Sequence, residues 1–203
     1  MRIGIMGGTF DPVHTGHLII AQEVAWRLGL DQVLFMPAAH PPHKQHQQVT
    51  SERCRLEMVR LATEDNPLFE VETLELERGG LSYTANTLET LCERLGQPPQ
   101  TLIYFIIGAD AAADLLSWYR PERVLELTRL AVVDRPGYHL PLDKLQAGLP
   151  NVDLNERILQ VEVPLIEIAA NGIRTRVQQG APIKYLVPPV IEEYIRREKL
   201  YSE

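Results

Sequence analysis

The 203 residues of the chain suffice for one well-packed α/β domain and are few for two independent domains. Hydrophobic residues make up 45% of the sequence and charged residues 23%, which is ordinary for a soluble globular protein and argues against extensive disorder. The net charge of −7 argues against a general nucleic-acid-binding or membrane-binding surface, so any phosphate must be bound by local features of the chain.

Cysteine usage and hydropathy indicate the expected compartment. The two cysteines, Cys54 and Cys92, both fall in predicted helices, which argues against a disulfide framework and fits a reducing environment. No apolar run approaches the ~18 residues of a membrane span, and the first residues lack the layout of a signal peptide. We therefore expect a soluble cytoplasmic protein.

The first predicted elements are an apolar strand at residues 2–6, a turn at Gly7 and Gly8, and a helix. The helix is indicated by apolar residues that recur every three or four positions, namely Leu18, Ala21, Ala25 and Leu28. The first N–H groups of a helix lack partners within it, and the helix dipole adds partial positive charge there, so this point attracts phosphate. Because Gly7 and Gly8 have no Cβ, a nucleotide can lie directly against the backbone.

Two histidines, His14 and His17, stand at the start of this helix. Three residues apart, they can share one face, and Gly16 between them leaves room for a ligand. Such a pair can also be a surface feature or part of a zinc site, but zinc commonly needs three or four protein ligands. No third ligand at matching spacing accompanies the pair, so the pattern favours phosphate binding over a metal site.

The signature of this stretch is Gly7-Gly8-Thr9-Phe10-Asp11-Pro12 followed by His14-Thr15-Gly16-His17. It resembles the signature of the nucleotidyltransferase superfamily with the His-x-Gly-His motif and, within it, that of the bacterial nicotinate-nucleotide adenylyltransferase family. The resemblance implies that ATP and nicotinate mononucleotide react to give deamido-NAD and pyrophosphate, as a step of NAD biosynthesis. It further implies in-line attack of the mononucleotide phosphate on the ATP α-phosphate, with Mg²⁺ held mainly by the ATP phosphates. The residues that it assigns to ATP here are Gly7, Gly8, Thr9, Phe10 and His17, with His14 and His17 as catalytic groups.

A strand at residues 32–36, ended by Pro37, completes a βαβ unit, which is almost always right-handed in a parallel sheet. Ligands of such sheets bind beyond the carboxyl ends of the strands, where the strand order reverses. The polar loop at residues 38–48 has adjacent prolines and is predicted to close over a ligand. Its Pro41-Pro42-His43-Lys44 matches a loop of the family, and the resemblance implies that His43 and Lys44 contact substrate phosphates, Lys44 also in catalysis.

The next elements are a helix capped by Thr50 or Ser51 and running to about Asp65, an extended segment at residues 68–76, and a helix with Leu88, Leu91 and Leu95 on one side. Tyr83 and Thr84 precede this last helix and match the Ser-Tyr-Thr segment of the family. By resemblance they line the pocket for the mononucleotide. Without it, they form only a helix cap.

The unbroken apolar run at residues 102–107 predicts a central strand that is covered on both faces. Gly108-Ala109-Asp110 can simply end this strand and cap a helix, but the resemblance implies that Gly108 and Asp110 contact the ATP ribose. Trp118 is either a core aromatic residue or, by resemblance, the side chain that stacks on the pyridine ring, for which a flat indole is suited.

The remaining elements are short helices near residues 111–116 and 122–127, a strand at 130–133, an irregular excursion at 134–155 and a strand at 158–163. A helix with Asn171 as its expected cap and a closing helix at 188–199 follow. The predicted fold is α/β, a Rossmann-like doubly wound parallel sheet of about five or six strands. We predict a single domain over residues 1–203, with a small C-terminal helical portion from about 164–203.

One stretch departs from the family, which usually has Ile-Ser-Ser-Thr-x-Ile-Arg near its C-terminus. Here Ile173 and Arg174, to which the resemblance assigns contacts with ATP and, for Arg174, a catalytic role, are kept, but Ala169 and Ala170 replace the serines. A lost hydrogen bond to a charged group costs about 1.5–3 kcal/mol. Alternative functions are therefore a catalytically weakened nucleotide-binding protein or another adenylyl- or cytidylyltransferase, such as one with pantetheine phosphate as acceptor. The sequence leaves open the preference for acid or amide pyridine nucleotides and the oligomeric state, a homo-oligomer included.

Overall fold

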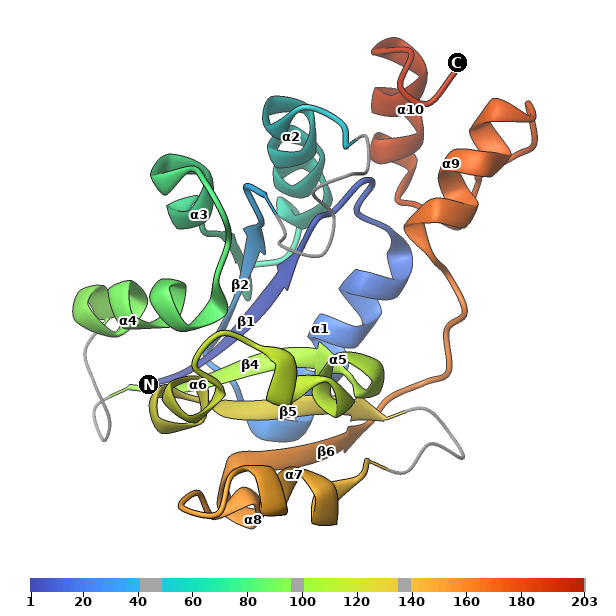
Figure 1. Ribbon diagram of the computed structural model, residues 1–203. Helices are drawn as coiled ribbons and strands as arrows, with labels where there is room; N and C mark the ends of the chain where they lie inside the picture. The colour runs from blue at the N-terminus through green and yellow to red at the C-terminus, as the bar shows by residue number, and fades with distance from the viewer. Residues whose placement is uncertain (41–48, 96–100, 135–139, 203) are drawn as a thin grey trace.

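A computed structural model describes residues 1–40, 49–95, 101–134 and 140–202 (Figure 1). Its centre is a six-stranded sheet with the order β3-β2-β1-β4-β5-β6, in which every neighbouring pair is parallel. The strands are β1 (Arg2–Gly8), β2 (Gln32–Pro37), β3 (Phe69–Val71), β4 (Leu102–Gly108), β5 (Arg129–Asp134) and β6 (Ile158–Glu162). The order reverses between β1 and β4, where open α/β sheets bind their ligands. The predicted Rossmann-like parallel sheet is confirmed.

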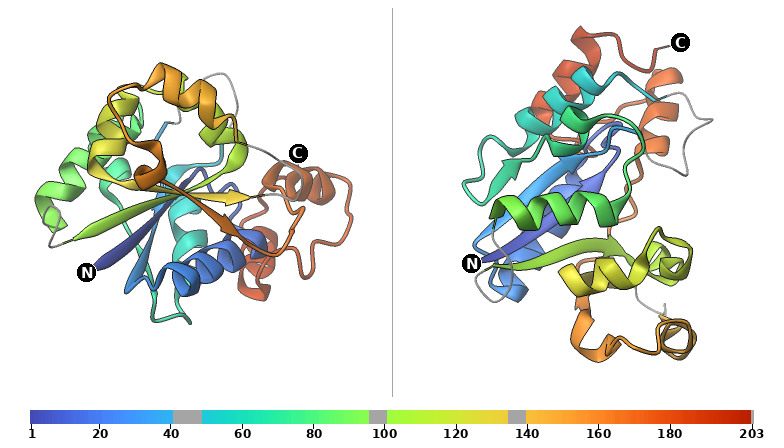
Figure 2. Two further views of the ribbon diagram at one scale, coloured as in Figure 1. Left: turned by 90° about the horizontal axis from the view of Figure 1, so that it is seen from below. Right: turned by 60° about the vertical axis from the view of Figure 1, so that its left-hand side comes forward.

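Helices cover both faces of this sheet (Figure 2). On one face lie α1 (Thr15–Leu28), α2 (Glu52–Thr63), α9 (Ala170–Gln178) and α10 (Pro189–Arg197). The other face carries α3 (Leu74–Arg78), α4 (Thr84–Leu95), α5 (Ala109–Ala113), the 3₁₀ turn η2 (Leu115–Ser117), α6 (Pro121–Leu127), α7 (Leu142–Gly148) and α8 (Leu154–Arg157). No helix in the described part of the chain is long and apolar enough to cross a membrane.

Two hydrophobic cores, one on each face, follow from the alternation of side chains along a strand. On β4, Tyr104 and Ile106 pack into the core under α1 and α2, whereas Ile103 and Phe105 pack into the core under α4 and α6. All four side chains are buried. The unbroken apolar run therefore belongs to a central strand, as predicted.

The predicted strand at residues 68–76 is wrong in its second half. Only Phe69–Val71 is a strand, and a helical turn, α3, begins at Leu74. The apolar positions shift from odd to even numbers after Val71, so one extended strand cannot keep them all on one face. The Glu72 carboxylate accepts the Leu74 backbone N–H at 2.9 Å, and Thr73 hydrogen-bonds Glu77 one turn later.

Two predicted boundaries also differ. Gly7 and Gly8 do not form a turn but continue β1, where Gly8 pairs with Pro37 of β2. The cap of α9 is Ala169 rather than Asn171, because the helix begins two residues earlier. The amide oxygen of Asn171 instead accepts the N–H of Gly172 at 2.8 Å.

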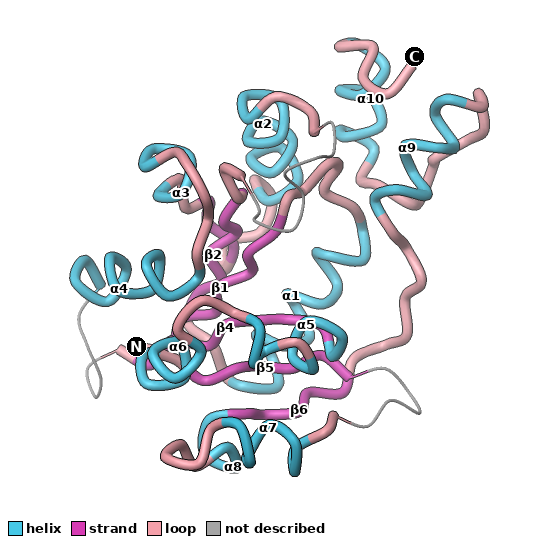
Figure 3. Tube along the Cα trace, viewed as in Figure 1, coloured by secondary structure: helices cyan, strands magenta, loops and turns pink. Residues whose placement is uncertain are grey.

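The C-terminal helical portion returns to the first half of the sheet. After β6, at the far edge, residues 163–169 run back beside α1, and α9 and α10 follow near the carboxyl end of β1 (Figure 3). Ile166 of this return segment lies next to Gly16, where an added Cβ would come within 3.4 Å of its Cγ2. The two ends of the chain thus contribute to the same edge of the sheet.

Candidate active site

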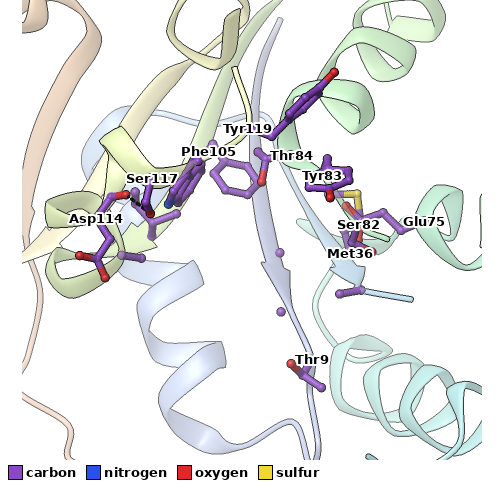
Figure 4. A pocket seen from close by; sticks show the side chains of 16 residues that line it. Thr9, Met36, Glu75, Ser82, Tyr83, Thr84, Phe105, Asp114, Ser117 and Tyr119 are labelled. Carbon is purple, nitrogen blue, oxygen red and sulfur yellow. Dashed lines mark hydrogen bonds between the residues drawn. The ribbon is translucent and has the colours of Figure 1, made fainter. Parts of the chain in front are cut away.

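A cavity of about 730 Å³ opens where the strand order reverses (Figure 4). Its floor comes from the ends of β1 and β4, and its walls from the start of α4 on one side and from α5 and the residues after it on the other. The lining residues are Gly7, Gly8, Thr9, Met36, Ala38, Glu75, Ser82, Tyr83, Thr84, Phe105, Ile107, Ala111, Asp114, Ser117, Trp118 and Tyr119.

Four aromatic side chains from both sides of the cavity line it, and together they are called the aromatic wall here: Tyr83, Phe105, Trp118 and Tyr119. The Tyr83 and Tyr119 rings lie 4.9 Å apart at 45°, and the Trp118 ring meets the Phe105 ring edge-on at 6.2 Å and 88°. Trp118 is half-buried, so it both packs on the core and faces the cavity. The core role considered for this tryptophan is therefore confirmed in part, and its stacking on a flat ligand stays a prediction.

The histidine pair lies at the first turn of α1. His14 is the residue before the helix, and its imidazole stacks on that of His17 with the ring centroids 3.6 Å apart and the planes at 21°. The backbone N–H of His14 donates to Nδ1 of His17 at 3.1 Å. A neutral His17 therefore carries its proton on Nε2, which is left as a donor.

Burial keeps both imidazoles neutral at pH 7. The pKa of His14 falls to about 4 because the ring is desolvated. The pKa of His17 falls well below its usual value through desolvation and through the neighbouring His14. Nδ1 of His14 is buried without a hydrogen-bond partner among the described residues. The pair is thus a set of hydrogen-bonding groups rather than two fixed cations.

Gly16 and Phe10 surround the histidine pair: the glycine leaves room for it, and the phenylalanine packs against it. A Cβ on Gly16 would lie 3.1 Å from Nδ1 of His14, so this glycine accommodates the imidazole rather than directly a ligand. Phe10 has a φ of 50° and is 2% exposed. Its ring packs over Gly8 and meets the His17 ring edge-on at 5.1 Å, so only its backbone can face a nucleotide.

Arg174, on α9, contacts the loop at residues 9–14 between β1 and α1, which is called the signature loop here. Its Nη1 donates to the carbonyl oxygen of Asp11 at 2.7 Å. Ile173 beside it is buried in the core, so it anchors the helix. Ala169 supplies no side-chain cap to α9, which leaves the first N–H groups of this helix without that partner.

Asp11 is a site residue that sequence reasoning did not single out. Its carboxylate accepts the Thr50 backbone N–H at 3.1 Å and the Tyr201 hydroxyl at 2.6 Å. Burial and Asp11 raise the pKa of Tyr201 above its usual value, so this hydroxyl keeps its proton and donates. No local pattern signals these pairs, because 39 and 190 residues separate the partners.

Arg55 is the second site residue that sequence reasoning missed. Its guanidinium is 1% exposed and donates to the carbonyl oxygens of Thr9 and Ala38 at 2.8 Å, of Thr50 at 3.0 Å and of Ala39 at 3.4 Å. It joins the signature loop, the end of β2 and the start of α2. The sequence signal is an arginine on the apolar face of a predicted helix, next to Met58 and Val59.

The other predicted residues are spread along the same edge of the sheet. Gly108 and Asp110 are exposed at the carboxyl end of β4, outside the cavity lining. Six predicted residues line the cavity: Gly7, Gly8, Thr9, Tyr83, Thr84 and Trp118. The histidine pair and Arg174 lie next to the signature loop. His43 and Lys44, in the loop at 38–48, lie outside the described residues.

The chain is similar to known proteins over most of its length. The model of the family "Cytidylyltransferase-like" matches residues 5–176. A Moorella thermoacetica protein named probable nicotinate-nucleotide adenylyltransferase is 43% identical over 201 residues, 98% of this chain and 91% of the relative. Relatives with the same name from Synechococcus sp. and Thermomicrobium roseum are 43% and 44% identical, over 100% and 98% of this chain and 98% and 91% of their own lengths.

Solved structures show the same fold. The Plasmodium falciparum nicotinic acid mononucleotide adenylyltransferase complexed with NaAD superposes with a TM-score of 0.77 at 17% identity, over 98% of this chain and 97% of that chain. The same enzyme complexed with APC gives a TM-score of 0.77 at 18% identity, over 98% and 96%.

Proposed function

The chain belongs to the cytidylyltransferase-like family and, within it, to the nicotinate-nucleotide adenylyltransferases, and from this premise we propose that it joins ATP and nicotinate mononucleotide to give deamido-NAD and pyrophosphate. The observation that carries the proposal is the position of the histidine pair. It stands at the start of α1, next to a cavity with an aromatic wall, so groups for a phosphate chain and for a flat ring share one edge of the sheet.

The reaction needs positioning more than acid–base chemistry. The attacking oxygen of the mononucleotide phosphate is already ionised at pH 7. It forms the new bond to the α-phosphorus of ATP while the bond between that phosphorus and the bridging oxygen breaks, and the bridging oxygen leaves with pyrophosphate. Catalysis then consists of in-line alignment and of stabilising the charge that builds up on the leaving group.

Several groups of this chain suit that task. Nε2–H of His17 is left as a donor because Nδ1 is occupied by the His14 backbone, and His14 lies stacked beside it. Arg174 adds a guanidinium next to the signature loop, and the first N–H groups of α9 add donors without charge. Lys44 would supply a second cation. The missing Cβ atoms of Gly7 and Gly8 make room for the Phe105 and Phe10 rings, and the two glycines line the cavity, where they would contact the nucleotide.

We expect Mg²⁺ to be held mainly by the ATP phosphates and not by side chains of the protein. No group of three or more His, Cys, Asp or Glu that could hold a metal occurs among the described residues. Mg²⁺ is commonly held by substrate phosphates and water with few protein ligands. When bound, it would neutralise charge on the leaving pyrophosphate.

The mononucleotide would place its pyridine ring against the aromatic wall. Trp118 and Tyr83 present ring faces to the cavity from opposite walls, and Thr84 adds a polar side chain and a helix N-terminus beside them. ATP would then occupy the side of the site near the histidines, with its ribose towards Gly108 and Asp110.

The test is pyrophosphate release from ATP with each acceptor in turn. We expect release with nicotinate mononucleotide and little with phosphopantetheine. Release with phosphopantetheine alone would reject the proposed acceptor. His17→Ala should abolish most turnover, since removing one donor to a developing charge costs about 10²–10³ in kcat. ATP binding by calorimetry without any turnover would instead favour a weakened nucleotide-binding protein, which the missing hydroxyls at Ala169 and Ala170 make a specific alternative.

A further inference from the structure

Asp11 lies where three parts of the chain meet. The residue is 4% exposed, and its three oxygen atoms accept hydrogen bonds from three different segments. One carboxylate oxygen accepts the Tyr201 hydroxyl at 2.6 Å and the other accepts the Thr50 N–H at 3.1 Å. Its carbonyl oxygen accepts Nη1 of Arg174 at 2.7 Å.

We propose that Tyr201 is a positioning residue of the phosphate-binding site, acting through Asp11 on Arg174 and His17. This inference rests on the function proposed above. It gives the segment after α10 a part in the site that neither the cavity nor the signature motif includes.

The backbone after α10 directs the Tyr201 hydroxyl towards Asp11. The helix ends in a Schellman motif, in which Lys199 has a φ of 51° and the N–H of Leu200 donates to the carbonyl of Ile195 at 3.0 Å. Tyr201 itself has a φ of 63°, which a bulky residue rarely adopts. A strained backbone that persists beside this partly buried hydrogen bond points to a side-chain direction that the fold maintains. Leu200 and Tyr201 also pack against the core under α2 and α10.

On the other side of Asp11 are the groups that would hold phosphate. The Asp11 carbonyl holds the guanidinium of Arg174, and the preceding residue, Phe10, packs edge-on against the His17 ring at 5.1 Å. A tilt of the Asp11 peptide therefore moves both side chains. Trp118 lines the cavity, whereas Asp11, Arg174 and Tyr201 do not, so we expect the aromatic wall to be unaffected by this connection.

Tyr201→Phe removes only the hydroxyl. The matched control is Tyr104→Phe, a buried tyrosine whose hydroxyl accepts from Nη1 of Arg129 at 3.5 Å, near the amino ends of the strands. Both variants are assayed by pyrophosphate release well below their thermal midpoints, so that unfolding does not contribute. For Tyr201→Phe we expect kcat/KM for ATP to fall about tenfold, because a carboxylate loses a hydrogen bond. We expect the KM for nicotinate mononucleotide to stay within about twofold, and Tyr104→Phe to match the wild type.

Equal changes in both substrates, or no change at all, would overturn the inference. A second measurement tests the route through Asp11. In an Asp11→Asn background, Tyr201→Phe should cost less than it does in the wild type, and full additivity would contradict the proposed route. If the wild type shows no adenylyl transfer, the proposed function fails while the positioning role is still testable. The ATP-induced rise in thermal midpoint should then be smaller in Tyr201→Phe than in Tyr104→Phe, and equal rises would reject it.

Discussion

The imidazoles of His14 and His17 stack at a centroid distance of 3.6 Å, and the backbone N–H of the first donates to Nδ1 of the second. Two charged rings could not lie this close in a buried site without a compensating anion. The stack therefore belongs to the neutral state of the pair. A bound phosphate chain would offer the anion that makes protonation of either ring less costly.

The first prediction concerns stability against pH. The folded-state pKa of His14 is about 4 against 6.5 for an ordinary histidine, and that of His17 is also lowered. Between these values the unfolded chain binds more protons than the folded one, so the free energy of unfolding should fall as the pH falls through this window. The His14 shift alone corresponds to roughly 3 kcal/mol.

Urea unfolding at a series of pH values measures this slope. His14→Gln should make it shallower, because this variant removes the buried imidazole whose pKa is lowered. An unchanged slope in His14→Gln would show that His14 is protonated alike in both states. In the wild type, proton NMR of the imidazole C–H groups should place the titrations of His14 and His17 below that of an ordinary histidine.

The second prediction concerns Arg55. Arg55→Met should lower the free energy of unfolding by about 3–5 kcal/mol, because it leaves buried carbonyl oxygens of three segments without their donor. Arg55→Lys should be intermediate, since an ammonium keeps the charge but lacks the planar fork. Arg60→Met is the control, as Arg60 is exposed on the same helix. A similar loss in both Met variants would mean that the carbonyl contacts contribute little.

The third prediction uses the two tryptophans of the chain. Trp118→Ala should raise the KM for nicotinate mononucleotide about tenfold, because the ring face in the cavity is lost. Trp118→Phe should recover part of the loss, and the KM for ATP should change little. Trp26→Ala should have no effect, since Trp26 is 73% exposed on α1. A larger increase in the KM for ATP than in the KM for the mononucleotide would show that ATP, and not the mononucleotide, binds at this wall.

The fourth prediction concerns Ala169 and Ala170. Changing both to serine should raise kcat/KM for ATP severalfold by restoring hydroxyl donors near the phosphates. A serine at position 169 should also add about 1 kcal/mol of stability, because Ala169 is the cap of α9 and has no side-chain oxygen. Ala181→Ser, after the same helix, is the control. Unchanged kinetics in the double variant would mean that other groups already fill this role.

The sequence predicted those features whose signals are local. The apolar runs predicted the strands, and the spacing of Leu88, Leu91 and Leu95 predicted α4. The glycines and histidines indicated that the ligand site lies at the carboxyl ends of the strands. The position of Trp118 at the cavity was expected from the resemblance alone, since one aromatic residue carries no direction.

The rest depended on partners that are distant in sequence. Arg55 is unremarkable as a residue until its four carbonyl acceptors, from residues 9 to 50, are brought together. Tyr201 and Asp11 are 190 residues apart. The error at α3 has another cause. Apolar and charged residues alternate in Leu74–Arg78, which suggests a strand, and only the shift of the apolar positions after Val71 speaks against one continuous strand.

Residues 163–169 leave the outermost strand, β6, and cross to α1 before entering α9. The half of the sheet with β4, β5 and β6 and the half with β1, β2 and β3 are thereby joined by this covalent segment as well as by the hydrogen bonds between β1 and β4. The segment also limits how far α9 can lie from β6, so a one-residue deletion within it should pull Arg174 away from the carbonyl oxygen of Asp11.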